Sequence, residues 1–163
     1  MRSTGRIARL SRGLPPQAAR QPLAPVSSDV RCALKLSDIA RLLSGDIDSG
    51  AFSVACAQEI AERRSLVGTN GLAVKRGAVI PVRVLDDCAI SVSQADVASL
   101  CRHFAQGELD AVTLSYIADA LQLAENVTWA DDDVAEYVAE FTDPEINGPF
   151  TVTRAIEIVS DAP

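Results

Sequence analysis

The sequence is poor in the residue types that most often build metal centres and cross-linked scaffolds. It has a single histidine, aromatic residues make up only 4% of it, and no two cysteines form a CxxC pair. The four cysteines lie far apart, at Cys32, Cys56, Cys88 and Cys101. In a chain large enough to fold without cross-links, this spacing indicates reduced, mostly buried thiols, and we therefore expect a cytoplasmic protein.

Long apolar runs and the familiar catalytic motifs are missing as well. No stretch of about 18 apolar residues occurs, so we expect a soluble protein with no membrane-spanning helix. The GxSxG, Walker-type, GxGxxG and HExxH patterns are also absent. The sequence therefore offers no support for serine, nucleotide or zinc chemistry, and we expect neither a cofactor nor a metal.

One short pattern, Cys-x-His at Cys101 and His103, invites a metal or thiol–imidazole interpretation. Side chains two positions apart on a helix point about 200° away from each other, so they cannot share one ion or one proton. Cys101 also belongs to an apolar stripe with Leu100 and Phe104. We therefore predict a core cysteine next to a surface histidine.

The chain does contain enough apolar material for one core. It has 163 residues, of which 48% are hydrophobic and 23% charged, which predicts a single helical domain over residues 31–163. Residues 1–30 differ, because they are rich in arginine and proline and nearly free of acids. They predict a disordered tail, although a mitochondrial-type transit peptide or an over-long translation start would have the same composition.

Charge is distributed unevenly along the chain, whose formal net charge is −7. Residues 1–30 carry +4, residues 31–100 carry 0 and residues 101–163 carry −11, because thirteen acids in the last third face only Arg102 and Arg154. Such an anionic surface repels nucleic acid and membrane headgroups and attracts basic proteins. We expect a basic protein partner and no binding of nucleic acid or membranes; the sequence leaves the oligomeric state open.

Apolar residues recur at helical spacing in six places after Leu36, which predicts a mainly α bundle of about six short helices built from two helical hairpins. Residues 67–92 differ, because glycines punctuate β-branched runs there, and they predict a short β-hairpin or extended insert. Polar residues suited to begin helices precede five of the stripes, namely Ser37, Asp48, Ser93, Asp110 and Asp131.

The two hairpins repeat one another at an offset of 62 residues. Residues 45–49, Gly-Asp-Ile-Asp-Ser, align with residues 107–111, Gly-Glu-Leu-Asp-Ala. The glycine suits the left-handed position after one helix, and the second acid accepts amide hydrogen bonds at the start of the next. Because any tightly linked helix pair benefits from these residues, the pattern indicates either a duplicated hairpin or two independent uses of one link.

The first copy, residues 40–68, resembles the opening helical hairpin of the colicin D-type immunity proteins. The shared features are a leucine-rich first helix, a link with Ile47 and the cap Asp48, Phe52 four residues beyond the cap, and a Glu-Arg-Arg cluster at residues 62–64. Members of that family are small helical bacterial proteins that bind and block the tRNA-cleaving domain of a toxin made by the same cell.

This resemblance implies a helical fold and a toxin-binding function, and it covers about thirty residues. The chain departs from the family in its greater length, in the insert near residues 67–92 and in the second copy of the hairpin near residues 102–121. Because of these departures, no toxin-contacting residue is carried over from the family.

Carboxylates gather on the predicted fifth helix. Asp132, Glu136 and Glu140 follow one another at intervals of four and so share one face, opposite to Val134 and Val138. The candidate partner-binding residues are Asp119, Glu125, Trp129, Asp131, Asp132, Asp133, Glu136 and Glu140, with Glu108, Asp110 and Tyr137 as further candidates. We expect charge reversal at Asp132, Glu136 and Glu140 to weaken binding without unfolding the protein.

Three interpretations of these carboxylates remain open: acid–base catalysis, a solvated helix start stabilised by the helix dipole, and a partner-binding face. The density of acids over residues 101–163 favours the partner-binding face. So many like charges repel one another on the folded surface, and carboxylates can bind the lysine and arginine side chains of a cleft that binds phosphates. The sequence thus predicts a non-enzymatic, immunity-type protein that neutralises a cognate bacterial toxin, a nuclease, by occluding its basic active cleft. The alternative is a helical adaptor or regulatory subunit with a basic partner.

Overall fold

A computed structural model describes residues 33–66, 82–142 and 148–162. The chain divides into two units, Met1–Val30 and Arg31–Pro163. The prediction of a disordered tail over residues 1–30 lies outside the described residues, and everything below concerns the second unit.

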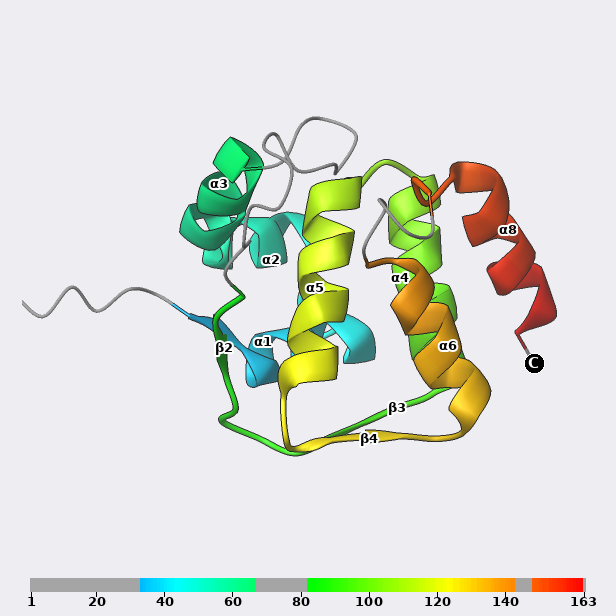
Figure 1. Cartoon of the computed structure of the whole chain (residues 1–163), viewed down its shortest axis with the longest axis horizontal. Coiled ribbons are helices and arrows are strands. Elements are labelled where there is room, and N and C mark those ends of the chain that lie inside the picture. Colours follow the sequence, from blue (N-terminus) through cyan, green and yellow to red (C-terminus); the bar gives the residue numbers. More distant parts are fainter. Residues whose placement is uncertain (1–32, 67–81, 143–147, 163) are drawn as a thin grey trace, which may run out of the picture. The chain divides into compact units, whose positions relative to one another are not determined.

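Helices dominate the described residues, which confirms the predicted mainly α fold (Figure 1). The elements in chain order are β1 (Leu34–Lys35), α1 (Leu36–Ser44), α2 (Ser49–Ala55), α3 (Ala57–Leu66), β2 (Val84–Leu85), β3 (Ile90–Val92), α4 (Gln94–Ala105), α5 (Ala111–Leu123), β4 (Val127–Trp129), α6 (Asp132–Glu140) and α8 (Val152–Asp161).

The strands form two separate two-stranded sheets, both parallel. β1 pairs with β2 in the register Leu34↔Val84, and β3 pairs with β4 in the register Ile90↔Val127. The two strands described in the predicted insert, β2 and β3, therefore pair with distant segments. Over residues 82–92 the hairpin alternative is wrong and the extended one is correct, while residues 67–81 lie outside the described part. Apolar β-branched runs indicate a strand, but they carry no information on its partner.

These pairings reveal that the internal repeat is larger than a helical hairpin. Among the described residues the first half is β1-α1-α2-α3-β2 and the second is β3-α4-α5-β4, and in each half the second strand lies parallel to the first. Parallel neighbours need a crossover connection, and the described helices lie between the paired strands in both halves. Helices α6 and α8 follow the second half.

The repeated link has the predicted geometry in both halves. Gly45 has φ 77° and Gly107 has φ 74°, so both adopt the left-handed conformation that ends a helix. Asp48 Oδ1 accepts the amide of Ala51 at 2.6 Å, and Asp110 Oδ1 accepts the amide of Thr113 at 2.8 Å. The aspartates thus satisfy amides that the following helices leave without an intrahelical partner.

Two predicted helix boundaries differ from the structure. The apolar stripe after Asp48 predicts one helix that carries Phe52, Cys56 and Ile60. The structure divides it into α2 and α3 at Cys56, which has φ −108° and ψ 19° and whose Sγ donates to Phe52 O at 3.1 Å. Helix α1 begins at Leu36, so the prediction that Ser37 caps it is wrong. Ser37 instead donates its amide and hydroxyl to the carboxylate of Asp87, at 2.9 and 2.7 Å. This partner is fifty residues away and leaves no local signal.

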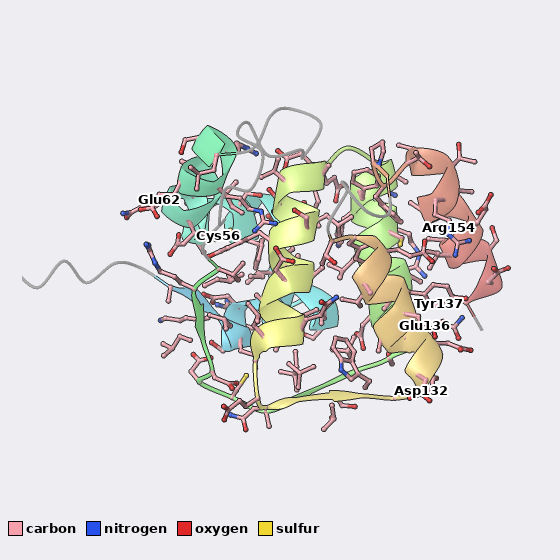
Figure 2. The ribbon with its side chains drawn as sticks, in the orientation of Figure 1. Cys56, Glu62, Asp132, Glu136, Tyr137 and Arg154 are labelled. Carbon is pink, nitrogen blue, oxygen red and sulfur yellow. The ribbon has the colours of Figure 1, made fainter. Side chains whose placement is uncertain are left out.

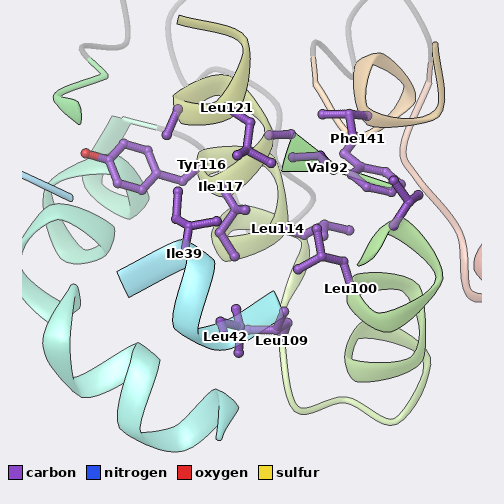
Figure 3. Close-up of a cluster of buried hydrophobic side chains, with 14 of the residues drawn as sticks. Ile39, Leu42, Val92, Leu100, Leu109, Leu114, Tyr116, Ile117, Leu121 and Phe141 are labelled. Atoms are coloured by element: carbon purple, nitrogen blue, oxygen red, sulfur yellow. The ribbon is translucent and has the colours of Figure 1, made fainter. Parts of the chain in front are cut away.

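Helix α5 is the centre of the core. Nearly all of its residues from Val112 to Leu121 are buried, which explains why it is apolar on several sides rather than along one stripe. Ile39 of α1, Leu100 of α4 and Ile117 of α5 are fully buried in one cluster (Figure 3). Helix α8 packs chiefly against α4, and α6 packs against α4 and α5. The core thus positions α6, which carries most of the candidate carboxylates, and α8.

Candidate functional site

Helix α6 presents its carboxylates away from the core. Val134 and Val138 are fully buried and anchor one side of the helix. On the other side Asp131, Asp132, Asp133 and Glu136 are all exposed (Figure 2 labels Asp132 and Glu136). Asp131 caps the helix, since its Oδ1 accepts the amide of Val134 at 2.9 Å. Three acids at a helix N-terminus also interact favourably with the helix dipole.

No cation of residues 33–66, 82–142 or 148–162 forms an ion pair with Asp132, Asp133 or Glu136. The structure therefore brings these three predicted residues together on one exposed, anionic face. We call Asp131, Asp132, Asp133 and Glu136 the α6 acidic face.

Glu140, the last member of the predicted row, has a different environment. Its carboxylate accepts two parallel hydrogen bonds from Arg154 of α8, from Nε at 2.8 Å and from Nη2 at 2.7 Å. Arg154 also donates to Glu157 at 3.1 Å, and its guanidinium lies 5.9 Å from the ring centroid of Tyr137. The hydrogen bonds to Glu140 and Glu157 raise the pKa of Arg154 above its usual range. Glu140 is thus already paired, and charge reversal there would also break this contact.

Asp119 and Glu125 lie apart from the α6 acidic face. Asp119 lies on α5, and its Oδ2 accepts a hydrogen bond of 2.5 Å from Nη2 of Arg63 on α3, which also donates to Ser115 Oγ at 3.1 Å. Glu125 is exposed beyond the end of α5, and its amide donates to Asp86 Oδ2 at 2.8 Å. Two of the predicted partner-binding residues therefore lie away from α6, and the negative charge of residues 101–163 is spread over a wider surface than the sequence predicts.

The two candidate aromatic anchors are half-buried. Trp129, on β4, packs against the core cluster. Tyr137, on α6, also packs against the core and faces Arg154 of α8. Each ring therefore contributes to the fold first and offers a partner only part of its surface.

A surface hollow of about 400 Å³ lies where the end of α6 meets the start of α8. Its lining consists of Glu140, Gly148, Pro149, Phe150, Thr151 and Arg154. The charged groups in it, Glu140 and Arg154, are already hydrogen-bonded to each other. The hollow therefore offers a partner a concave surface, but its two charged side chains already bind each other.

The pKa values of three described carboxyl groups, Asp87, Glu108 and Asp110, are all lowered. Hydrogen bonds from the Ser37 hydroxyl and amide lower the pKa of Asp87, and a hydrogen bond with His103 lowers that of Glu108. For Asp110, burial acts to raise the pKa, but hydrogen bonds from Thr113 and the nearby Arg64 outweigh it. A lowered pKa keeps a carboxyl group ionised, so none of the three is suited to donate a proton near neutral pH.

Cys101 lies in the core, as predicted, whereas His103 is half-buried rather than on the surface. Cys101 is fully buried, and burial together with the nearby Glu140 raises its thiol pKa to about 12. The Nδ1 atom of the half-buried His103 lies 2.6 Å from Glu108 Oε2, which also accepts the Ser49 hydroxyl at 3.2 Å. This contact joins the links of the two halves, which the repeat alone does not predict. The described ranges contain no group of three or more His, Cys, Asp or Glu that could hold a metal ion.

No protein-family model matches the chain, and no curated protein or solved structure matches it. Within the described residues, no helix is long and apolar enough to cross a membrane.

Proposed function

We propose that this chain is a non-enzymatic binding protein of the immunity type, which neutralises a bacterial nuclease toxin by covering its basic active cleft. The observation that carries the proposal is the α6 acidic face, where Asp132, Asp133 and Glu136 are exposed and lack an ion pair among the described residues. Its nearest basic neighbour along the chain, Arg154, is already held by Glu140 and Glu157.

The chemistry of this face fits a cleft that binds phosphates. Asp132 and Glu136 are four residues apart, so their backbone positions are separated by about 6 Å along the axis of α6 and lie on one face of the helix. Arginine and lysine side chains that line a nuclease cleft bind carboxylates with the same hydrogen-bond geometry that they use for phosphates. The face therefore competes with nucleic acid for the same cationic groups.

The mechanism is steric and electrostatic occlusion. The negative field accelerates the encounter with a positively charged cleft, and docking then excludes the substrate. Because the attraction acts on the encounter, added salt should slow association more than it speeds dissociation.

The test begins with the neighbouring reading frame, which the proposal expects to encode a protein with a basic C-terminal nuclease domain. That domain is mixed with the full chain, tRNA cleavage is measured, and association is followed by stopped-flow at several salt concentrations. The double variant D132N/E136Q should associate about threefold to tenfold more slowly. The control D46N/E62Q removes the same charge from two exposed residues outside α6, Asp46 in the link after α1 and Glu62 on α3. It also breaks the ion pair of Glu62 with Arg83, so urea unfolding must first show that the control is folded; it should then associate at the normal rate.

Equal association rates for both double variants would reject the α6 acidic face as the binding surface. Tight binding of the basic protein without any loss of tRNA cleavage would favour the adaptor function instead. Glu140 is left unchanged in these variants because it also holds Arg154.

A further inference from the structure

Helix α8 carries more apolar surface than its packing in the fold uses. Ala155 and Ile158 are fully buried on the side that faces α4. A second stripe, at intervals of four and three residues, consists of Val152, Ile156 and Val159. Val159 is half-buried, whereas Val152 is 47% exposed and Ile156 is 54% exposed.

Val152 and Ile156 differ from the other exposed apolar residues of the described ranges. Val54, Leu85 and Leu123 are also exposed, but each lies on a different element. Single exposed apolar side chains are normal on a protein surface, whereas neighbours on one helix face form a contact surface. Val152 and Ile156 lie one turn apart on α8, and we call them the α8 apolar pair.

Carboxylates border the α8 apolar pair. A surface hollow of about 390 Å³ runs along α8, and Thr153, Arg154, Ile156, Glu157, Ser160 and Asp161 line it. Arg154 is the only cation among its described lining residues, and Glu140 and Glu157 already hold that guanidinium. The surroundings of Ile156 are therefore net anionic, so a second copy of this chain would bring like charges together, whereas a cationic partner would not.

We propose that the outer face of α8 receives an amphipathic, basic helix of the partner. Its apolar side chains contact Val152 and Ile156, and its lysine or arginine side chains reach Asp161, which forms no ion pair with a described cation. This inference rests on the proposed function and deepens it, because it adds an apolar anchor to the electrostatic attraction of α6. Binding of an amphipathic helix by apolar contacts one turn apart, flanked by charges, is a general mode of peptide recognition.

The test uses the full chain and two synthetic peptides of about 18 residues, long enough to form a helix. The first peptide has leucines at helical spacing among lysines. In the second, serines replace the leucines and the charge is unchanged. Binding is measured by fluorescence anisotropy, and the leucine peptide should bind about tenfold more tightly than the serine peptide.

The decisive variant is V152S/I156S, which should bind the leucine peptide about tenfold more weakly and the serine peptide as the wild type does. The variant I156L should retain binding, since it preserves the apolar contact. The matched control V54S/L123S removes two exposed apolar side chains from other elements and should leave both affinities unchanged. Urea unfolding midpoints verify that all of these variants fold.

Unchanged binding by V152S/I156S, or an equal loss in V54S/L123S, would overturn the α8 inference. If D132N/E136Q still weakens the serine peptide in that case, the α6 acidic face attracts cationic groups without the α8 contact. If the chain binds neither peptide, the α8 inference is wrong, and the nuclease experiment alone decides the proposed function. If sedimentation shows a dimer that V152S/I156S dissociates, the occupant is a second copy and the inference is wrong.

Discussion

Arg154 holds Glu140 through two parallel hydrogen bonds of 2.8 and 2.7 Å, which connect α8 to α6. The two residues are fourteen positions apart, on separate helices. This contact removes Glu140 from the row of free carboxylates that its spacing with Asp132 and Glu136 predicts. It also connects the end of α6, which carries the acidic face, to the start of α8, which carries the apolar pair.

The first prediction concerns the strength of this pair. R154Q and E140Q should each lower the free energy of unfolding by about 1 kcal/mol, and a double-mutant cycle should give a coupling of about 0.5–1 kcal/mol. The value stays small because the Arg154 and Glu140 side chains are 37% and 35% exposed, and solvent screens them. Urea unfolding at low and high salt measures it.

The control for this cycle is Asp38 with Arg41, a pair on α1 at 3.5 Å whose arginine side chain is 54% exposed. Its coupling should be only a few tenths of a kcal/mol. A coupling at Arg154 and Glu140 no larger than at this control pair would show that the two hydrogen bonds do not stabilise the fold.

A second prediction follows from the two glycines of the repeated link. Nothing lies within 4 Å of a Cβ built on Gly45 or Gly107, so an alanine there meets no steric obstacle, and the cost comes from the left-handed backbone alone. G45A and G107A should each lower the free energy of unfolding by about 1 kcal/mol. Asparagine tolerates this conformation better, so G45N and G107N should lose less.

Urea unfolding of the four glycine variants provides the measurement. Because φ is nearly the same at both positions, the two alanine variants should have similar stabilities. Wild-type stability in both would contradict the assignment of these glycines to the left-handed region.

The third prediction concerns the thiols. Burial raises the pKa of Cys56 to about 11, with Glu59 adding to the effect, and that of Cys101 to about 12. Because the thiolate is the reactive form, neither thiol should react rapidly with a disulfide reagent at about pH 8 in the folded protein. The variant C32S/C88S isolates these two cysteines. It should show almost no rapid reaction until denaturant is added, when both should react; a fast native phase would contradict the buried positions.

Local signals explain which parts of this fold the sequence predicts. Gly45 and Asp48 act within a few residues of themselves, as do Gly107 and Asp110, and the links that they form have the expected geometry. The buried stripe at Val134 and Val138 likewise predicts the side of α6 that faces the core.

The parts that the sequence does not predict depend on distant partners. Ser37 does not cap α1 but donates its amide to Asp87, fifty residues away. Strand β2 pairs with the distant β1 rather than with a strand next to it in the sequence. At the candidate site, the exposure of Asp132 and Glu136 follows from helical spacing, whereas the pairing of Asp119 with Arg63 does not. A charge count does not reveal which carboxylates have a cation, because that depends on the tertiary fold.

The last prediction is a pH dependence that depends on Asp110. Its pKa is lowered in the folded protein, so the folded state binds fewer protons than the unfolded chain near the ordinary aspartate pKa. The stabilisation is therefore fully present above about pH 4 and is lost as the pH falls through the lowered value. D110A should lose about 1 kcal/mol at neutral pH, because the Thr113 amide loses its cap. The difference from wild type should shrink between about pH 4 and pH 2, as urea unfolding at several pH values would reveal.

D46N, which removes an exposed charge but caps no helix, should cost less at neutral pH. A D110A deficit that stays constant down to pH 2 would show that the ionised carboxylate is not what stabilises the start of α5.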